Sequence, residues 1–598
     1  MLNITFPLPL FSSICLIRYK ILKPILKMIR LRIPKFHRLL MAVLVVAAMM
    51  TGQCAWALEQ LKVNDYTFST GTDGEGEYYV IDGTTALNAL ATYVNAGNNA
   101  SGKRFKMTTS VTYSYVSGYD WNSDSETYNT IDNNNYTPIG NTTYGFSGTF
   151  DGDGKTVSGI RIFRDGSGDV AQCLGLFGYV GVGGKVKNVT IADVRITGHD
   201  NVGGIAGKNQ GIVANSHVAS NVAIHAVNTS AINHGGIVGY NVSSGSEVSY
   251  CTSAAQLSIK AGVTSTDYYG GVVGTNEGAI RYNIADGALV PKTATVQGAI
   301  AGVNTDSGYC YYNYYANCTV GTSTSNVGTG LGDVAVNDGA VAATVLHENT
   351  SVSSSLTGTV AFRREFTGGI PSTVVFPFGY TKDSEGTYYT FTGVSYNKTT
   401  SRWEATMTEV GAFTLAPNTP YLFKPAGTGT HQVVLFHGTA AYAAAGATVI
   451  GNWTFKGVYE PKTWTPGEIG TDYGFAATNG KGTDGVTDVA AGEFVQIGAG
   501  AHIHPLRSYL TYTGSGNPWA APARRDAPQE LPQTITVVLR AANGQTTLID
   551  RLPDMQSGKS GEWYSLGGVR LNGMPTVPGV YIFNGEKVVI KSGKEVLK

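Results

Sequence analysis

Six acidic side chains are spread along the centre of the chain. They are the candidates in this region for the catalytic carboxyl groups of a glycan-cleaving enzyme. Glycosidases need two carboxyl groups about 5 to 10 Å apart, one as the acid and one as the base or nucleophile. No repeated spacing brings two of these six together, so the sequence predicts no catalytic residue. A lyase or hydrolase stays as the alternative. The six are Asp193, Asp200, Glu247, Asp267, Glu277 and Asp286.

A possible calcium loop begins at Asp151 and Asp153. Lys155 stands where the next ligand should be, and no Glu closes a twelve-residue loop. We therefore interpret the segment as a hairpin turn between the strand residues 149–150 and Val157.

Histidine and cysteine residues also lack the spacing of known sites. His347-Glu348 has no second histidine, as a zinc-protease motif requires, and neither a GxSxG nucleophile nor a phosphate loop is present. His502 and His504 lie on one face of a predicted strand and could bind a metal ion together. Two histidines in such a position are more often simply exposed to solvent. We expect no metal and no cofactor. Four cysteines without a CxxC pair are interpreted as free core residues or, for the last two, as a disulfide: Cys173, Cys251, Cys310 and Cys318.

Tyrosines crowd the end of the central region. Their rings could stack on sugars as a glycan platform, or they could pack against the next domain as a cap, which is the favoured interpretation. The four candidates for glycan contact are Tyr268, Tyr269, Tyr311 and Tyr312.

A glycine signature of five residues recurs through the centre, and its last glycines stand 29, 32, 35 and 28 residues apart. An asparagine follows the last glycine by two residues in four of the units, and a short predicted strand comes after it, as at 212–218. The signature residues are Gly175, Gly178, Gly203, Gly207, Gly235, Gly239, Gly270, Gly274, Gly298, Gly302, Asn209, Asn241, Asn276 and Asn304.

This periodicity predicts a solenoid in which each unit forms one coil. Equivalent residues would then lie about 4.8 Å apart along parallel ladders. Glycine supplies backbone freedom where the coil turns tightly, and stacked asparagine amides can hydrogen-bond to one another. The predicted fold class is all-β: a parallel β-helix-like solenoid, β-sandwich-type domains and a small C-terminal β module.

The N-terminus reads as a secretory signal. A basic stretch at 30–38 precedes an apolar run at 39–50 and the small-x-small site ending at Ala57, with Met28 as the expected start. The run is too short to span a membrane. Eight basic residues precede the first acidic residue, Glu59. The chain from Glu59 onward therefore has 34 basic and 42 acidic residues. That balance argues against nucleic acid as a partner.

The other boundaries follow composition. An amphipathic helix is predicted at 84–94, with Thr84 or Thr85 as its cap. It lies where a solenoid needs a cap over its open end. The predicted segments are 1–57 (signal), 58–145 (capping segment), 146–335 (solenoid), 336–513 (one or two β-sandwiches), 514–534 (Pro-rich linker) and 535–598 (C-terminal module).

Two resemblances follow from these residues. The stretch FSGTFDGDGKTVSGI at 146–160, followed by LGLFG at 174–178 and the GGxxG units, resembles the GLUG-motif repeat proteins of bacterial surfaces. WYSLGGVRL at 563–571 and PGVYI at 578–582 resemble the C-terminal sorting tails of secreted proteins from Bacteroides-like bacteria, which use a type IX-like secretion route. Together the resemblances imply an outer-membrane or extracellular location.

We therefore expect an exported cell-surface adhesin or scaffold that binds host or environmental glycans or proteins, and not an enzyme. A glycan-cleaving enzyme and a purely structural spacer are the alternatives.

Overall fold

The computed structural model describes the chain in several stretches, which together cover most of residues 58–542. They are residues 58–114, 134–164, 172–226, 233–259, 265–290, 294–305, 307–320, 341–427, 429–476, 478–482, 485–514 and 531–542, with short strands at 121–122, 127–128, 546–548 and between 563 and 597.

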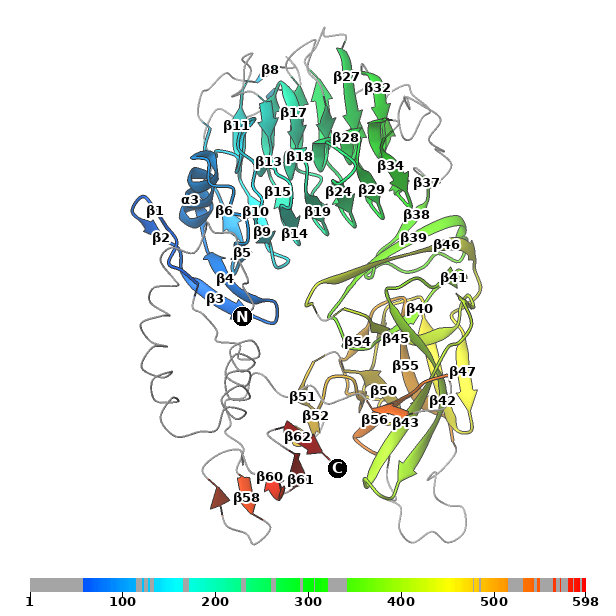
Figure 1. The fold of residues 1–598 in the computed structure, drawn as a ribbon. Coiled ribbons are helices and arrows are strands. Elements are labelled where there is room, and N and C mark those ends of the chain that lie inside the picture. The colour runs from blue at the N-terminus through cyan, green and yellow to red at the C-terminus, as the bar shows by residue number, and fades with distance from the viewer. Residues whose placement is uncertain are drawn as a thin grey trace, which may run out of the picture. The chain divides into compact units, whose positions relative to one another are not determined.

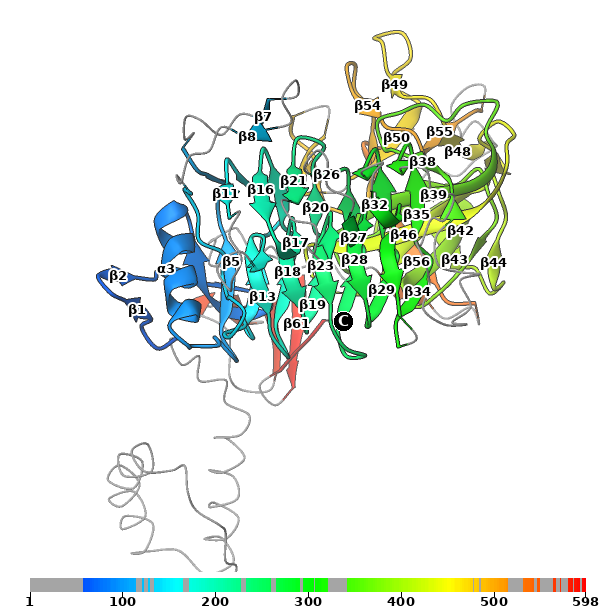
Figure 2. The same ribbon diagram turned by 90° about the horizontal axis from the view of Figure 1, so that it is seen from above.

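The centre of the chain is a parallel β-solenoid. One coil runs through five short strands that each belong to a different sheet: β13 (Phe177–Val180), β14 (Lys185–Lys187), β15 (Thr190–Ala192), β16 (Arg195–Gly198) and β17 (Asp200–Gly203). The next coil pairs with this one in parallel, strand for strand. Figures 1 and 2 show equivalent strands of successive coils lying side by side. The all-β solenoid predicted from the repeats is confirmed.

Five sheets form the walls. The nine-stranded sheet has the order β3 (Thr70–Asp73), β4 (Gly76–Ile81), β5 (Arg104–Met107), β9 (Thr149–Asp151), β14, β19 (Ile212–Ala214), β24 (Glu247–Ser249), β29 (Ala279–Arg281) and β34 (Tyr309–Tyr311). The eight-stranded sheet has the order β37 (Val341–Ala342), β35 (Tyr314–Ala316), β30 (Ile284–Asp286), β25 (Thr252–Ser253), β20 (His217–Val218), β15, β10 (Thr156–Ser158) and β6 (Val111–Thr112).

The other three walls are shorter. The six-stranded sheet comprises β11 (Arg161–Phe163), β16, β21 (Ala223–Ala226), β26 (Gln256–Ile259), β31 (Leu289–Val290) and β36 (Thr319–Val320). One five-stranded sheet comprises β12 (Gln172–Leu174), β17, β22 (His234–Gly235), β27 (Ser265–Gly270) and β32 (Ala294–Gly298). The other comprises β13, β18 (Ala206–Asn209), β23 (Val238–Asn241), β28 (Val273–Asn276) and β33 (Ala301–Asn304).

The core of the solenoid is a stack of equivalent side chains. Each middle residue of the nine-stranded sheet pairs with its counterpart in the next coil and is buried, because alternate residues of a strand point to opposite faces. This buried row consists of Phe105, Phe150, Val186, Val213, Val248, Ile280 and Cys310.

Two strand predictions need correction. The strand predicted at 212–218 is two strands, β19 and β20, separated by Asn215, whose φ of 45° turns the chain between two sheets. The hairpin predicted around Asp153 is wrong as well. Its two strands, β9 and β10, lie in different sheets, so the segment is a corner of the coil.

The predicted helix is present as α3 (Thr84–Asn95), the only helix in the described part of the chain. Its apolar side, including Leu87, Leu90 and Val94, is fully buried. The predicted threonine cap is wrong. Gly83 is the N-cap residue and makes no side-chain capping bond, while Thr84 already lies in the first turn. Before the helix, β1 (Lys62–Val63) pairs with β2 (Tyr66–Thr67).

After the solenoid, β38 (Thr344–Leu346), β39 (Thr357–Phe366) and β46 (Gln432–Ala441) form a three-stranded sheet. It shares one aromatic core, which contains Phe362, Phe376 and Phe436, with a larger sheet. The larger sheet has the order β40 (Ser372–Val375), β45 (Pro420–Pro425), β42 (Gly386–Asn397), β43 (Arg402–Glu409), β56 (Thr534–Arg540), β53 (Phe494–Gln496), β50 (Asp472–Phe475), β55 (Arg507–Tyr512), β48 (Trp453–Val458) and β47 (Ala447–Ile450), with β57 (Thr546–Leu548) beside β56.

The two packed sheets give the sandwich-like architecture that the alternating aromatic strands predict. A second core, with Phe391, Met407, Phe455 and Leu510, packs against the larger sheet. Three short strand pairs complete this region: β41 (Tyr380–Thr381) with β44 (Thr414–Leu415), β49 (Lys462–Thr463) with β54 (His502–Ile503), and β51 (Gly480–Lys481) with β52 (Asp488–Val489).

Strand β56 follows the proline-rich segment at 514–534, yet it pairs with β43 and β53 of the larger sheet. The last described strands form an antiparallel sheet of five, in the order β59 (Arg570–Leu571), β58 (Trp563–Ser565), β60 (Gly579–Phe583), β61 (Glu586–Lys591) and β62 (Lys594–Leu597). Within the described stretches, no helix has the length and apolar character needed to cross a membrane.

Candidate functional site

The repeated asparagines form a continuous ladder inside the solenoid. The amide nitrogen of Asn209 donates to Asn241 Oδ1 at 2.8 Å, Asn241 donates to Asn276 at 2.7 Å, and Asn276 donates to Asn304 at 2.7 Å. The first three side chains are fully buried. They also close the local turn, since Asn209 and Asn276 each accept from the backbone N–H two residues later.

The repeated glycines let two walls approach closely. A Cβ atom on Gly207 would lie 2.5 Å from the backbone nitrogen of Leu174, one on Gly274 2.6 Å from that of His234, and one on Gly302 2.7 Å from that of Tyr269. All of these neighbours are backbone atoms of the five-stranded sheet that contains β12. The signature residues therefore build the scaffold of the solenoid.

Five of the six acidic residues of the repeats each contact a side chain that is not a carboxylate. Asp193 contacts Arg161 at 2.9 Å, Asp200 contacts His199 at 2.8 Å and Asp286 contacts His347 at 3.2 Å. Glu247 pairs with Arg281 at 2.8 Å, and Glu277 accepts from the hydroxyl of Tyr240 at 2.6 Å. Asp267 lies in a stretch whose side chains are not described. Each of the five described acids therefore has a different partner.

Lysine side chains contact both carboxylates of the segment that begins like a calcium loop, Asp151 and Asp153. Asp151 is buried, contacts Lys187 Nζ at 3.2 Å and accepts from the amide of Asn188 at 2.8 Å. Asp153 contacts Lys106 at 2.9 Å. Burial alone would raise the pKa of Asp153, but hydrogen bonds from Lys106 and Lys155 outweigh it and lower that pKa. The loop is thus part of a network of ion pairs.

This network continues onto the two N-terminal strands of the nine-stranded sheet. Arg104 Nη2 donates to Asp73 Oδ2 at 2.7 Å, and Lys106 contacts the same carboxylate at 2.9 Å. Lys187 also reaches Glu75 at 3.0 Å. The charged end of this sheet is therefore neutralised by its own side chains.

Histidine and cysteine side chains do not gather into a metal site in the part of the chain that is described. The rings of His502 and His504 have centroids 5.3 Å apart. All four cysteines are free thiols, so the disulfide interpretation does not hold. Burial raises the pKa of Cys251 and of Cys310 to about 12, which makes both unreactive at neutral pH.

The four predicted glycan-contact tyrosines do not share one surface. Tyr269 is fully buried and stacks on His234, and Tyr268 is half-buried in the same strand, β27. Tyr312 stacks on Tyr282 at 5.3 Å and on His437 of β46 at 5.2 Å. That contact with the following domain is the capping arrangement that the sequence favoured.

Tyr311 instead points outward at the end of the nine-stranded sheet. It pairs with Arg281, and Tyr309, two residues earlier on the same face of β34, pairs with Ala279. Residues two apart in a strand are separated by about 7 Å. Tyr309 is 59% exposed. Beside the two rings lies the ion pair of Arg281 with Glu247.

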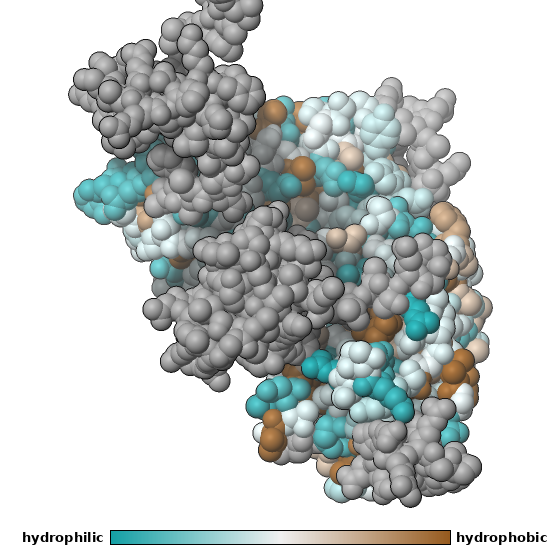
Figure 3. All heavy atoms as spheres, turned by 60° about the horizontal axis from the view of Figure 1, so that its bottom comes forward, coloured by the Kyte–Doolittle hydropathy of each residue, from teal (hydrophilic) through white to brown (hydrophobic). Residues whose placement is uncertain are grey.

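We refer to Tyr309, Tyr311, Arg281 and Glu247 as the tyrosine platform. Edge-to-face contacts hold the ring of Tyr311 in place. Its centroid lies 6.2 Å from that of Tyr282 and 5.7 Å from that of Tyr312. Flat aromatic faces beside a guanidinium and a carboxylate can hold the apolar face and the hydroxyl groups of a sugar at the same time. In the view of Figure 3, hydrophobic residues are scattered among hydrophilic ones.

His234 is a buried titratable group in the same scaffold. Its side chain is fully buried, with its ring 5.1 Å from that of Tyr269. Burial, together with the nearby His225 and His199, lowers the pKa of His234 to about 3, from 6.5 in an exposed histidine.

Acid is therefore expected to destabilise the solenoid through His234. Between pH 6.5 and about 3 the unfolded chain binds a proton that the folded chain excludes, so stability is lost as the pH falls through this window. Going from pH 7 to pH 5 should cost about 2 kcal/mol from this group. Urea unfolding at both pH values measures the loss. His234→Phe keeps the ring stack and should lose about 2 kcal/mol less than the wild type, whereas an equal loss would contradict the assignment.

Comparison with known proteins gives one partial similarity. No family model matches the chain, and no solved structure is significantly similar to it. Over 177 residues the chain is 30% identical to halomucin of Haloquadratum walsbyi (strain DSM 16790 / HBSQ001). The match covers 28% of this chain and 2% of halomucin. The chain thus corresponds to a small fraction of this relative's length.

Proposed function

We propose that this is an exported cell-surface protein, an adhesin or scaffold, whose solenoid binds host or environmental glycans through the tyrosine platform. The observation that carries the proposal is the pair of outward tyrosines, exposed Tyr309 and half-buried Tyr311, beside the ion pair of Arg281 and Glu247. Aromatic rings and charged hydrogen-bonding groups that converge on a rigid surface suit a ligand that has both apolar and hydroxyl faces.

Several observations support the proposal. The signal-like N-terminus and the sorting-type tail favour export to the outer membrane or beyond it, and the partial similarity to halomucin is compatible with export. The resemblance to GLUG-motif proteins stays a prediction. The rigid scaffold matters because a preorganised surface loses little conformational entropy when it binds.

Retention on immobilised glycans tests the binding proposal. The wild-type protein should be retained by at least one member of a panel of mucins and plant polysaccharides. The double variant Tyr309→Ala/Tyr311→Ala should bind about tenfold more weakly, since each lost ring contributes about 0.5 to 1.5 kcal/mol. Phe413→Ala is the matched control, because Phe413 is an exposed aromatic residue (71%) outside the solenoid.

Other outcomes would overturn the proposal. Release of soluble oligosaccharides would favour the enzyme alternative. A protein that is retained on no glycan would instead favour the purely structural spacer. Antibody labelling of intact cells tests the location separately, because a protein found only inside the cell could not serve as an adhesin.

A further inference from the structure

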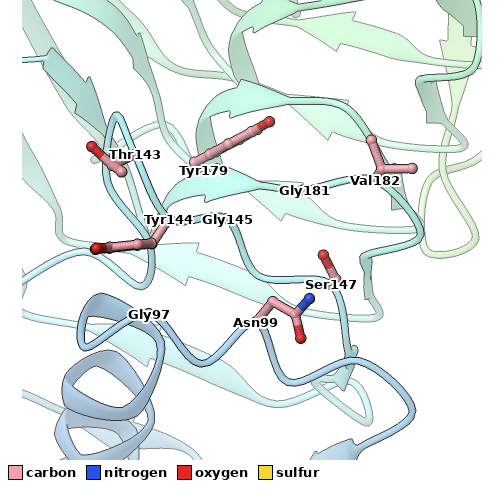
Figure 4. A pocket seen from close by; sticks show the side chains of 9 residues that line it. All are labelled: Gly97, Asn99, Thr143, Tyr144, Gly145, Ser147, Tyr179, Gly181 and Val182. Atoms are coloured by element: carbon pink, nitrogen blue, oxygen red, sulfur yellow. The ribbon is translucent and has the colours of Figure 1, made fainter. Parts of the chain in front are cut away.

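A hollow of about 250 Å³ lies at the N-terminal end of the solenoid, away from the tyrosine platform. Three segments that are distant in sequence surround it: the turn after α3, the loop at 143–147 and the end of β13 with the turn that follows. Figure 4 shows its lining residues: Gly97, Asn99, Thr143, Tyr144, Gly145, Ser147, Tyr179, Gly181 and Val182.

Two glycines of neighbouring coils form the floor. A Cβ atom on Gly145 would lie 2.9 Å from the Cα of Gly181, and one on Gly181 would lie 2.9 Å from the hydroxyl oxygen of Ser147. The two backbones thus touch where any larger side chain would fill the space. A bare glycine floor lets a ligand approach the peptide groups closely.

Two tyrosines supply the aromatic walls. Tyr179 is held in place, since Lys208 Nζ lies 4.8 Å from its ring centroid and its hydroxyl group hydrogen-bonds to Gln210. Tyr144 is 44% exposed and has its ring next to Gly97. A fixed ring and an accessible ring can pack against the C–H face of a small ligand without large rearrangement.

Uncharged polar groups line the rest of the hollow. Asn99 uses its side-chain oxygen to accept from the backbone of Ser101 at 3.1 Å. Among the described residues, its amide nitrogen and the hydroxyl groups of Thr143 and Ser147 have no hydrogen-bond partner within the protein. They are therefore available to donate to, or accept from, a ligand. No charged side chain lines the hollow.

We infer that this hollow binds one neutral sugar residue. Its volume lies below the roughly 300 to 1,000 Å³ of sites for drug-sized ligands, which suits a single ring. The ligand must offer apolar C–H groups to the tyrosines and hydroxyl groups to Asn99, Thr143 and Ser147. A carboxylate or phosphate would find no cation in the lining and would lose its hydration without compensation. The inference does not depend on the tyrosine platform.

Titration of the purified protein with monosaccharides tests the site. Glucose, galactose and N-acetylglucosamine are the neutral probes, and glucuronate is the charged counterpart of glucose. Saturation-transfer NMR should detect at least one neutral sugar with a Kd of about 1 to 10 mM, the range of a small, weak site. Glucuronate should bind at least about tenfold more weakly than glucose or not at all, because its charge is not neutralised.

Variants locate the binding. Tyr144→Ala should weaken it about fivefold to tenfold, because one stacking wall is lost from an exposed position. Thr143→Ala should weaken it about threefold, and Thr142→Ala, the neighbouring residue that does not line the hollow, should bind like the wild type. Thermal unfolding of each variant confirms that the fold is intact.

Three results would overturn the inference: no neutral monosaccharide binds, glucuronate binds as tightly as glucose, or Tyr144→Ala binds like the wild type. The Tyr309→Ala/Tyr311→Ala variant should still bind monosaccharides at this hollow. A failure of the platform proposal and a failure of this inference are therefore separate results.

Discussion

Replacing Gly239 by alanine is expected to unfold the solenoid or to lower its stability by more than about 4 kcal/mol, the range of the most damaging single substitutions. The added Cβ atom would lie 2.5 Å from the backbone nitrogen of Val202, 2.6 Å from the carbonyl carbon of Asn201 and 2.7 Å from the carbonyl oxygen of Asn233. All three belong to paired or stacked backbone, so no flexible side chain can move away. Relief would require two walls to separate.

Gly245→Ala is the matched control. This glycine belongs to the same coil, and a Cβ atom there would have no neighbour within 4 Å. The free energy of unfolding of the Gly245→Ala variant should differ from that of the wild type by less than about 0.5 kcal/mol. Urea unfolding followed by circular dichroism compares the two variants with the wild type. A Gly239→Ala protein as stable as Gly245→Ala would show that the walls are not in close contact.

The second large effect is expected from Asn241→Ala, in the middle of the asparagine ladder. The substitution removes the acceptor of Asn209 and the donor of Asn276, and it leaves a cavity among fully buried side chains. Each buried polar group left without a partner costs about 1 to 3 kcal/mol. Asn209 keeps weaker contacts at 3.2 Å to the carbonyl oxygens of Gly211 and Glu247, so the expected loss is about 3 kcal/mol rather than the maximum.

Asn304→Ala provides the comparison, because Asn304 ends the ladder. It accepts from Asn276 and donates to the carbonyl oxygen of Gly308, so its removal interrupts only one ladder bond. Its cost should be about half that of Asn241→Ala. Chemical denaturation of both variants measures the difference. Equal losses would mean that the ladder bonds contribute no more than the local turns.

The solenoid could be predicted because its repeats depend on local features. A glycine is needed wherever the walls touch, and an asparagine is needed wherever the ladder passes, so both recur at each coil. The number of strands per coil was harder to predict. The chain turns from one sheet to the next at single residues with positive φ. These corner residues are Asn188, Asn215, Tyr250, Tyr282 and Tyr312, with φ values between 45° and 59°. Asparagine is a familiar residue for that conformation, but tyrosine is not.

The candidate binding sites were harder to predict for a different reason. Tyr311 was selected from the sequence, yet the exposed partner Tyr309 and the ion pair beside it come together only through the register of three strands, β24, β29 and β34. The hollow draws on residues 97–99, 143–147 and 179–182. No spacing in the sequence joins such segments, because the coil closure places them side by side. Strand β56 likewise enters its sheet after a proline-rich segment that reads as a linker.

The repeated parallel pairing of successive coils has a consequence for how such a protein can change over time. From β18 to β33 the coils pair in the same register, and asparagine stacks on asparagine at each of these three junctions. Duplication or loss of one of these units of about 30 residues would therefore keep the pairing between coils, while it would shift the contacts of Arg363 and His431 with Asn215 and Asp153. It would move the tyrosine platform relative to the N-terminal hollow by one strand spacing, about 4.8 Å. The number of coils therefore sets the distance between the tyrosine platform and the N-terminal hollow, and a gain or loss of repeats changes that distance in fixed steps.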